Sequence, residues 1–229
     1  MSGNGGYVAG VFAGLLGTPE QDVEVTLRSP VPLDKPMQVL RTGGLATLMD
    51  GDTLIAEVKP VQISLQVPEL PNVERVRAAR DLSYSLTDKS NPIMPGRQGF
   101  HPVCFCCGAE HENGLYVFAA PIEGTNQVAA AWETKSEWAA SDGLLPAEYL
   151  WTALDCPGQF AWLAAGTRTG MLGRITARVL ERPVAGEPLL VTAWPIDVDG
   201  KKHYAGSAIH TESGRLLARA LSVWIGRRD

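Results

Sequence analysis

The sequence predicts an α+β protein in which one unit, a helix followed by an antiparallel meander of strands, occurs twice. Three observations predict this: two helical segments, a series of alternating strand segments after each, and matching turn signals within both series. The 229 residues suffice for one large domain or two small ones. A hydrophobic fraction of 45% and a charged fraction of 20% are typical of a chain with a packed core.

The first unit begins with an apolar helical segment, residues 5–16. The strand segments predicted after it are residues 23–27, 37–49 and 53–67. The dipeptide Asp50-Gly51 between the last two segments is a hairpin signal, because aspartate and glycine tolerate the positive φ of tight turns.

The second unit repeats this order. A helical segment spans residues 146–165, and predicted strands follow at residues 175–180, 189–196, 204–211 and 216–225. Asp199-Gly200 occupies the place of the earlier hairpin signal, and a further turn falls at residues 212–214. The two series therefore predict a duplicated unit.

We divide the chain into an N-terminal unit at residues 1–70, a linker at 71–100 and a C-terminal unit at 101–229. Residues 73–82 carry mixed charge and predict a short surface helix within the linker. Residues 91–99 are rich in Pro and Gly and show no periodicity, which is typical of a connection between units.

Charge and cysteine usage indicate the cellular setting. The net charge of −5, without a run of Lys or Arg, argues against a nucleic-acid partner. The apolar stretch at residues 7–17 is too short to span a bilayer and has no basic flank before it. Four cysteines, two of them adjacent, do not resemble a disulfide framework. We therefore expect a cytoplasmic protein without a membrane partner.

The second half contains a C-x-x-C-G opening at Cys104–Gly108, then Asn113-Gly114-Leu115, then segments at residues 154–158 and 214–220 with motifs of their own. Together these motifs resemble the thioesterase-like hotdog superfamily. The resemblance implies a double hotdog, with two curled sheets joined and two central helices side by side. The strand that usually precedes the first helix is missing, so either the first sheet is one strand short or the chain starts upstream.

The second helical segment carries a polar stripe. Glu148, Thr152, Asp155 and Gln159 follow one another at spacings of four, three and four residues, which places them on one helix face. One interpretation is that this face touches water. The other is that it lines a cleft between the two units.

Asp155 is the candidate catalytic residue. Pro157 predicts that the helix kinks or ends nearby, which places the carboxylate near a helix C-terminus, where the dipole disfavours negative charge. Burial raises a carboxylate pKa in the same direction. The resemblance implies that Asp155 activates water or attacks a thioester carbonyl, while the Ala147 N–H at the helix start serves as oxyanion donor.

The polar neighbours of Asp155 on the stripe are given roles in the same reaction. Thr152 would position the water, and Glu148 and Gln159 would bind substrate. The chain departs from many relatives at Leu145-Pro146-Ala147, where they carry His-Gly-Gly.

The first helical segment has no charged residue, so we expect one site per chain. Gly6, Gly10 and Gly14 form a smooth stripe, and each glycine costs about 1 kcal/mol in a helix interior. Either the second helix or an acyl group packs on this stripe, or the segment is simply a tightly packed core helix. Asn4, Gly5 and Gly6 resemble the opening of a hotdog helix, whose N–H groups would face the cleft.

Two further patterns have competing interpretations. His101, Cys104, Cys107 and His111 have the compact spacing of zinc ligands, but the C-x-x-C-G opening of the relatives implies no metal. We expect no bound metal, with Cys104 and Cys107 as thiols near the second helix. Lys201 and Lys202 either meet the phosphates of coenzyme A or form a solvated hairpin tip.

The sequence therefore favours an acyl-CoA thioesterase-like hydrolase acting on a small-molecule acyl thioester. Its rival is a catalytically silent acyl-CoA binding protein, which the altered helix start at Ala147 favours. No cofactor is expected beyond coenzyme A as part of the substrate. Chains could also pair through their sheets into a homo-oligomer.

Overall fold

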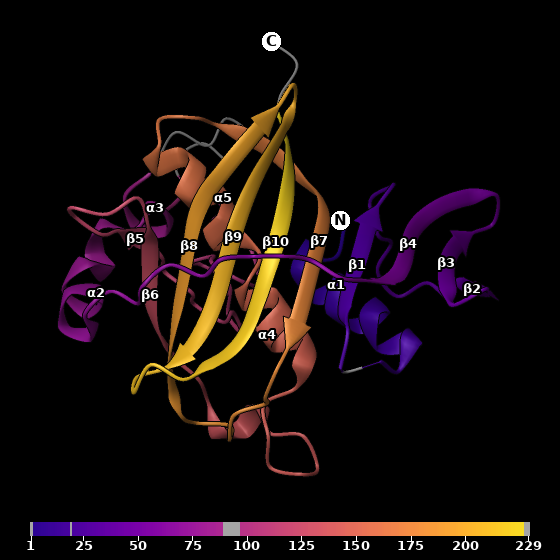
Figure 1. Cartoon of the computed structure of the whole chain (residues 1–229), viewed down its shortest axis with the longest axis horizontal. Coiled ribbons are helices and arrows are strands. Elements are labelled where there is room, and N and C mark those ends of the chain that lie inside the picture. The colour runs from indigo at the N-terminus through magenta and orange to yellow at the C-terminus, as the bar shows by residue number, and fades with distance from the viewer. Residues whose placement is uncertain (1, 19, 89–96, 227–229) are drawn as a thin grey trace.

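One antiparallel sheet of ten strands organises the computed structural model, which describes residues 2–18, 20–88 and 97–226 (Figure 1). The strand order is β2-β3-β4-β1-β7-β10-β9-β8-β6-β5. The strands are β1 Asp22–Leu27, β2 Gln38–Thr42, β3 Leu45–Asp50, β4 Thr53–Val61, β5 Ala120–Pro121, β6 Val128–Glu133, β7 Thr169–Val179, β8 Pro188–Asp199, β9 Lys202–Thr211 and β10 Leu216–Gly226. The predicted α+β class with an antiparallel meander after each helix is confirmed.

The sheet repeats the same strand order outward from its centre. Strands β1 and β7 pair antiparallel at the middle, with Val25 opposite Ile175. From β1 outward the order is β4, β3, β2, and from β7 outward it is β10, β9, β8. Each strand of the first series therefore has a counterpart in the second, as expected for a duplicated unit. The boundaries of the units at residues 70 and 101 stay a prediction.

Three helices cover one face of this sheet, behind the strands in Figure 1. They are α1 Gly5–Ala13, α4 Ala147–Ala153 and α5 Cys156–Ala164. Helix α1 packs along α4 and contacts β1, whereas α5 lies on β8 and β9. Shorter elements complete the fold: α2 Val73–Ala79, α3 Tyr84–Thr87 and the 3-10 turns η1 Gly14–Leu16, η2 Arg80–Leu82 and η3 Ser136–Trp138.

The second central helix is interrupted at Asp155. Helix α4 ends at Ala153, and α5 begins at Cys156, with Pro157 in its first turn. Proline is tolerated there because the first N–H groups of a helix need no intrahelical acceptor. Asp155 thus lies just beyond the end of α4, near the helix break that Pro157 predicts, and it also occupies the N-cap position of α5 because the chain re-enters a helix at once.

Two predicted strands are wrong in extent. Residues 37–49 form the hairpin β2–β3 rather than one strand, since Gly43 and Gly44 adopt φ values of +58° and +81° between them. The strand predicted at residues 53–67 ends with β4 at Val61. Strands β5 and β6 were not predicted, although the run from Val128 to Trp132 is apolar and follows a turn.

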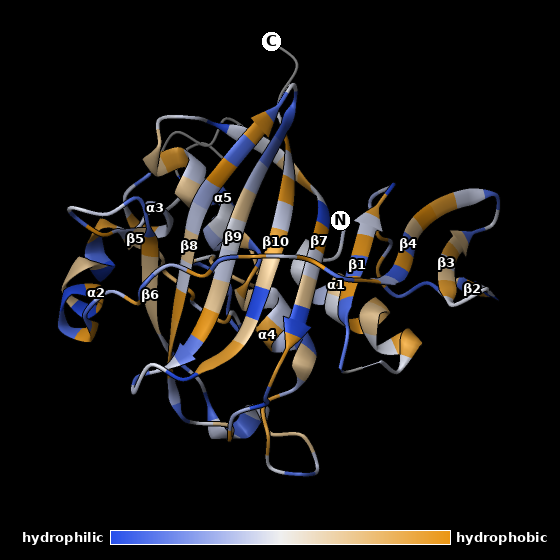
Figure 2. Cartoon of the chain, viewed as in Figure 1, coloured by the Kyte–Doolittle hydropathy of each residue, from blue (hydrophilic) through white to orange (hydrophobic). Residues whose placement is uncertain are grey.

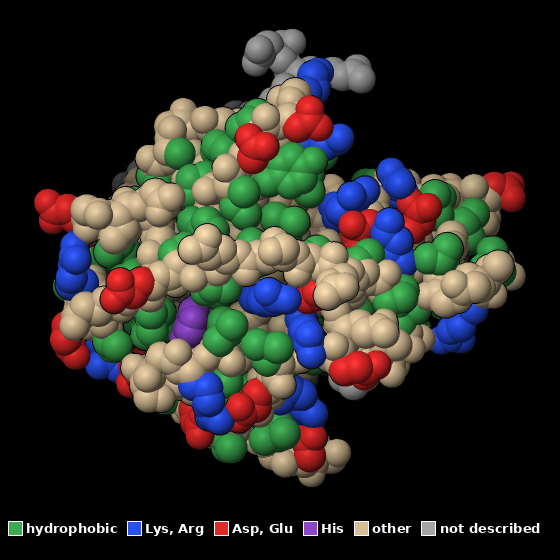
Figure 3. All heavy atoms as spheres, viewed as in Figure 1, with side chains coloured by type: hydrophobic (Ala, Val, Ile, Leu, Met, Phe, Trp, Pro, Cys, Tyr) green, Lys and Arg blue, Asp and Glu red, His purple; other side chains and the backbone are tan. Residues whose placement is uncertain are grey.

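Residues 62–71, which we call the strap, cross the outer face of the sheet between β4 and α2 (Figure 1). Arg219 of β10 donates to the Leu65 carbonyl at 3.4 Å, and Gln127 donates to the Glu69 carbonyl at 3.0 Å. Hydrophobic side chains lie on the surface above and below the strap (Figure 3). Residues 91–96 of the connection predicted at 91–99 lie outside the described residues.

The core lies between the helices and the sheet. Hydrophobic and hydrophilic residues alternate along the long strands (Figure 2), and the apolar face of the sheet meets the central helices. Trp132 and Phe160 are among the largest fully buried side chains. Within the described residues, no helix is long and apolar enough to cross a membrane.

Candidate functional site

Asp155 meets the beginning of the other central helix. Its Oδ2 accepts a hydrogen bond of 2.8 Å from the backbone N–H of Gly6 in α1. Its Oδ1 is buried and has no hydrogen-bond partner among the described residues. The residue is buried, with an exposure of only 3%. A buried carboxylate with one free oxygen is unusual, because burial without a partner is costly.

The start of α1 is built to present N–H groups at this point. Asn4 caps the helix, and its Oδ1 accepts a hydrogen bond of 3.0 Å from the Tyr7 N–H. The N–H of Gly5 forms no hydrogen bond with any other described residue. The half-buried side chain of Leu172 lies over Gly5, and a Cβ added to Gly5 would meet its Cδ2 at 2.9 Å. Free N–H groups at a helix start favour a negative oxygen.

Burial raises the pKa of Asp155 to about 7. The nearby Cys104 sulfur adds to this rise, and the Gly6 N–H partly offsets it by stabilising the charged form. A carboxyl group with this pKa can accept a proton near neutral pH, as a general base requires. The largest cause is desolvation by burial, one of the two effects expected from the sequence.

The residues of the polar stripe do not lie on one continuous helix, because α4 ends at Ala153 and α5 begins at Cys156. The Thr152 hydroxyl is buried and donates to the Glu148 carbonyl at 2.6 Å, so its hydrogen bond lies within α4. Gln159 donates to the Gly170 carbonyl at 2.8 Å, and its Oε1 lies 2.8 Å from His101 Nε2. The expected roles of Thr152 in positioning water and of Gln159 in binding substrate therefore compete with hydrogen bonds inside the protein.

Ala147 and Glu148 lie at the other end of α4, away from Asp155. Both line a cavity of about 650 Å³ between α1, α4 and β7, together with Gly10, Trp151 and Arg178. The N–H groups next to Asp155 come from α1 instead, so the expectation of an oxyanion donor at Ala147 needs correction. Sequence alone could not separate these helix starts, because their pairing depends on the antiparallel approach of α1 and α4.

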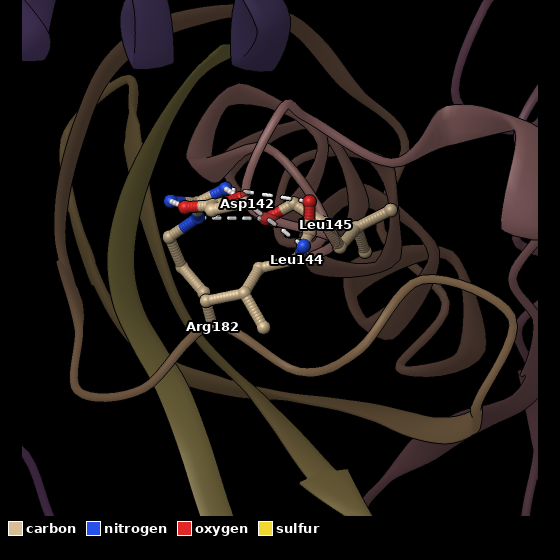
Figure 4. Close-up of polar contacts among 4 residues, drawn as sticks. All are labelled: Asp142, Leu144, Leu145 and Arg182. Atoms are coloured by element: carbon tan, nitrogen blue, oxygen red, sulfur yellow. Dashed lines mark hydrogen bonds and ion pairs between the residues drawn. The ribbon is translucent and has the colours of Figure 1, made fainter.

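The loop before α4 is fixed by Arg182 (Figure 4). Arg182 donates to both carboxylate oxygens of Asp142, at 2.8 and 3.2 Å, and its Nε donates to the Leu145 carbonyl at 2.9 Å. Asp142 in turn accepts from the Leu144 N–H at 3.1 Å. These contacts hold the chain just before Ala147, on the rim of the 650 Å³ cavity.

Two of the three helix glycines lie at the helix contact. A Cβ on Gly6 would come within 2.7 Å of the Trp151 carbonyl oxygen, and one on Gly10 within 2.7 Å of the Glu148 Cα. These approaches explain why α1 has glycine there. Gly14 was expected at the same contact, but a Cβ there would meet nothing within 4 Å, because α1 changes into the 3-10 turn η1.

Four thiols gather beside Asp155. Cys104, Cys106 and Cys107 of one turn meet Cys156, the first residue of α5. Burial is the main cause that raises the pKa of Cys106, and a hydrogen bond to Cys104 is the main cause for Cys107. A thiol with a raised pKa is a poor nucleophile. Spacing along the sequence does not group Cys156 with the others, because it lies 49 positions after Cys107.

The compact zinc set considered from the sequence is not assembled. His101 faces Gln159, as described above, and His111 Nδ1 accepts a hydrogen bond of 3.1 Å from the Asn113 N–H. The two histidines therefore have other partners. At the distant β8–β9 hairpin, Lys202 pairs with Asp199 at 3.4 Å and is exposed, in keeping with a solvated tip.

Comparison with solved structures identifies the fold. A proposed thioesterase from Novosphingobium aromaticivorans matches with a TM-score of 0.56 at 14% identity, over 98% of this chain and 88% of that one. A tesB protein of Mycobacterium avium subs paratuberculosis matches with a TM-score of 0.57 at 15% identity, over 98% and 87%. A thioesterase superfamily protein matches over 60% of this chain and 70% of its own, with a TM-score of 0.51 and 19% identity.

The chain therefore has the hotdog fold of the thioesterase superfamily. No protein-family profile matches the sequence, and no curated protein sequence does so either. The resemblance stated from the motifs is confirmed at the level of the fold.

Proposed function

We propose that this protein is a thioesterase-like hydrolase that cleaves an acyl-CoA thioester with Asp155. One observation carries the proposal: a buried carboxylate with one free oxygen faces the N-terminus of a different helix. A carbonyl carbon held near Oδ1 would have its oxygen close to the first N–H groups of α1. A carboxylate and preorganised N–H donors are the groups that acyl transfer needs. A cytoplasmic setting, with reduced cysteines, belongs to the same proposal.

The reaction consumes one water molecule and breaks the carbon–sulfur bond of the thioester. Asp155 takes a proton from water, hydroxide adds to the carbonyl carbon, and the free N–H of Gly5 at the start of α1 stabilises the oxyanion, while the Gly6 N–H stays bonded to Asp155. The thiol of coenzyme A leaves with the proton, and a carboxylic acid remains. Direct attack by the carboxylate would form an anhydride that water then hydrolyses, so both routes depend on Asp155.

A panel of acyl-CoA substrates, followed by release of free thiol, tests this proposal. Asp155→Asn keeps the size of the side chain and an acceptor for the Gly6 N–H but removes the base. Turnover should fall by about 10²–10⁴-fold, the usual contribution of a positioned general base. Asp199→Asn makes the same chemical change at the exposed hairpin tip and should leave turnover unchanged. Equal turnover by Asp155→Asn and the parent protein would refute the assignment.

The second candidate is an acyl-CoA binding protein without catalysis. The 650 Å³ cavity favours it, because this cavity lies at the Glu148 end of α4 rather than at Asp155. Calorimetric titration with the same acyl-CoA panel separates the two functions. Binding without thiol release, unaffected by Asp155→Asn, would support the silent protein.

A further inference from the structure

The thiols beside Asp155 include three sulfurs that converge on one point. The Sγ atoms of Cys104, Cys107 and Cys156 all lie within 4.8 Å of one another. The closest pair, Cys104 and Cys156, is separated by 3.6 Å. In a tetrahedral zinc–thiolate site the Zn–S distance of about 2.3 Å places sulfurs about 3.8 Å apart. The Cys104–Cys156 distance is close to this value, and the other two sulfur–sulfur distances are at most 4.8 Å.

We propose that Cys104, Cys107 and Cys156 form a binding site for one thiophilic divalent cation of the zinc type. The donor set is chemically selective, because three thiolates favour soft or borderline ions over magnesium and calcium. The sequence spacing instead places Cys104 and Cys107 with His101 and His111, so it does not predict this set of ligands. Its evidence and its test are separate from those of the thioesterase proposal.

The turn that carries the first two ligands is shaped to present them together. The Gly108 N–H donates to the Cys104 carbonyl at 2.8 Å, which closes the C-x-x-C segment. A Cβ on Gly108 would come within 2.5 Å of the Cys104 backbone nitrogen, so glycine is required for this close approach. The spacing of two residues between ligands is typical of structural zinc sites.

Hydrogen-bond donors surround the first sulfur. The Cys107 N–H bonds to the Cys104 sulfur, and the Asn4 amide donates to the same sulfur at 3.5 Å. Such donors reduce the charge that thiolates place on a bound ion and orient the ligands. Cys104 is half-buried, whereas Cys107 and Cys156 are buried, so an ion would enter from the side of Cys104.

Cys106 provides a control within the same turn. It is as buried as Cys107 and contacts Cys156, yet its sulfur is outside the group of three. The backbone N–H of Cys156 donates to it instead. A bound ion would join residues 104–107 to the first residue of α5 and so stabilise the folded chain.

Cobalt(II) is the probe for the ligand set, because thiolate coordination gives it a charge-transfer band. The reduced, chelator-treated protein should bind one cobalt ion per chain, and zinc should displace it. Cys104→Ser, Cys107→Ser and Cys156→Ser should each lose this band, whereas Cys106→Ser should keep it. Zinc should raise the melting temperature of the parent and of Cys106→Ser only, because a ligand that binds the folded state stabilises it. Circular dichroism checks that every variant folds.

Three outcomes would overturn the proposal. A folded parent protein without a cobalt band has no such site. Equal loss of the band in Cys106→Ser and the other three variants excludes this ligand set. A deficit of two thiols on titration of the denatured, air-exposed protein, without metal binding after reduction, would assign the cluster to a disulfide instead. None of these results bears on thiol release from acyl-CoA, which tests the thioesterase separately.

Discussion

The environment of Asp155 is suited to proton transfer and does not stabilise its charged form well. Its Oδ1 is buried without a partner among the described residues, and a lone hydrogen bond from Gly6 satisfies the other oxygen. Structural aspartates in folded proteins normally cap helices or pair with cations. Asp155 sits at the N-cap position of α5 but makes no capping hydrogen bond with its side chain.

Asp155→Asn should therefore keep or increase the free energy of unfolding. The substitution removes a buried charge, whose burial is unfavourable unless it is fully paired. Denaturant unfolding of both proteins measures the difference. A clearly lower midpoint for Asp155→Asn, with unchanged turnover, would identify Asp155 as a structural residue.

At this scale the sequence identified Asp155 and the glycines at the start of α1 but not their contact partners. The stripe of polar residues was visible from helical spacing, whereas the hydrogen bonds of Thr152 and Gln159 were not. Such partners lie far apart in the chain, as for Gln159 and His101. The grouping of Cys156 with Cys104 has the same origin, because spacing rules describe neighbours along the chain only.

At the scale of elements, the packing of α1 on α4 depends on two glycines. Gly10→Ala should destabilise the protein by about 1–3 kcal/mol, because the new methyl group would force the helices apart. Gly14→Ala is the matched control one turn later. It meets open space at a helical φ of −58° and should stabilise by up to about 1 kcal/mol. Urea unfolding of both variants tests the contact, and equal effects would contradict it.

Arg182 and Asp142 anchor the loop that leads into α4 (Figure 4). Hydrogen bonds from Arg182 are the main cause that lowers the pKa of Asp142 below its ordinary value of 3.8. A lowered pKa contributes stability above the unfolded-state pKa, and this contribution is lost as the pH falls through the folded-state value. Arg182→Lys loses the planar, bidentate geometry and one carbonyl contact.

We expect Arg182→Lys to melt below the parent at neutral pH, with faster amide exchange in residues 139–145. The difference in melting temperature between the parent and Arg182→Lys should become smaller as the pH falls below about 3.8, where Asp142 becomes protonated. Arg215→Lys, which changes an exposed pair with Glu181, should have little effect. A gap that widens in acid would contradict this account.

Sequence patterns predict the strands correctly where a clear turn signal separates them. Turn signals at Asp50-Gly51 and Asp199-Gly200 were recognised, and hairpins form at both. The equally clear Gly43-Gly44 turn was overlooked within a run of strand formers, so two strands were merged. The short strand β5 pairs through only two residues and leaves almost no pattern in the sequence.

At the scale of the whole molecule, the two halves of the sheet meet through β1 and β7 of one chain. This contact is intramolecular, so its free energy does not depend on how many molecules are present. The melting temperature should therefore stay constant across a wide range of protein concentration. Differential scanning calorimetry of dilute and concentrated samples measures this. A melting temperature that rises with concentration would show that contacts between chains contribute.

Because the strap joins the two series of strands in one chain, the two ends of the α1–α4 helix pair can carry different residues. In a dimer of identical chains, symmetry copies every substitution into both equivalent positions. The strap instead connects the two series of strands covalently, so a change in one has no counterpart in the other. A carboxylate can thus reside at the start of α1 while an open cavity occupies the start of α4. With the strap in place, one end of the α1–α4 pair can hold reactive groups and the other end can hold a binding cavity.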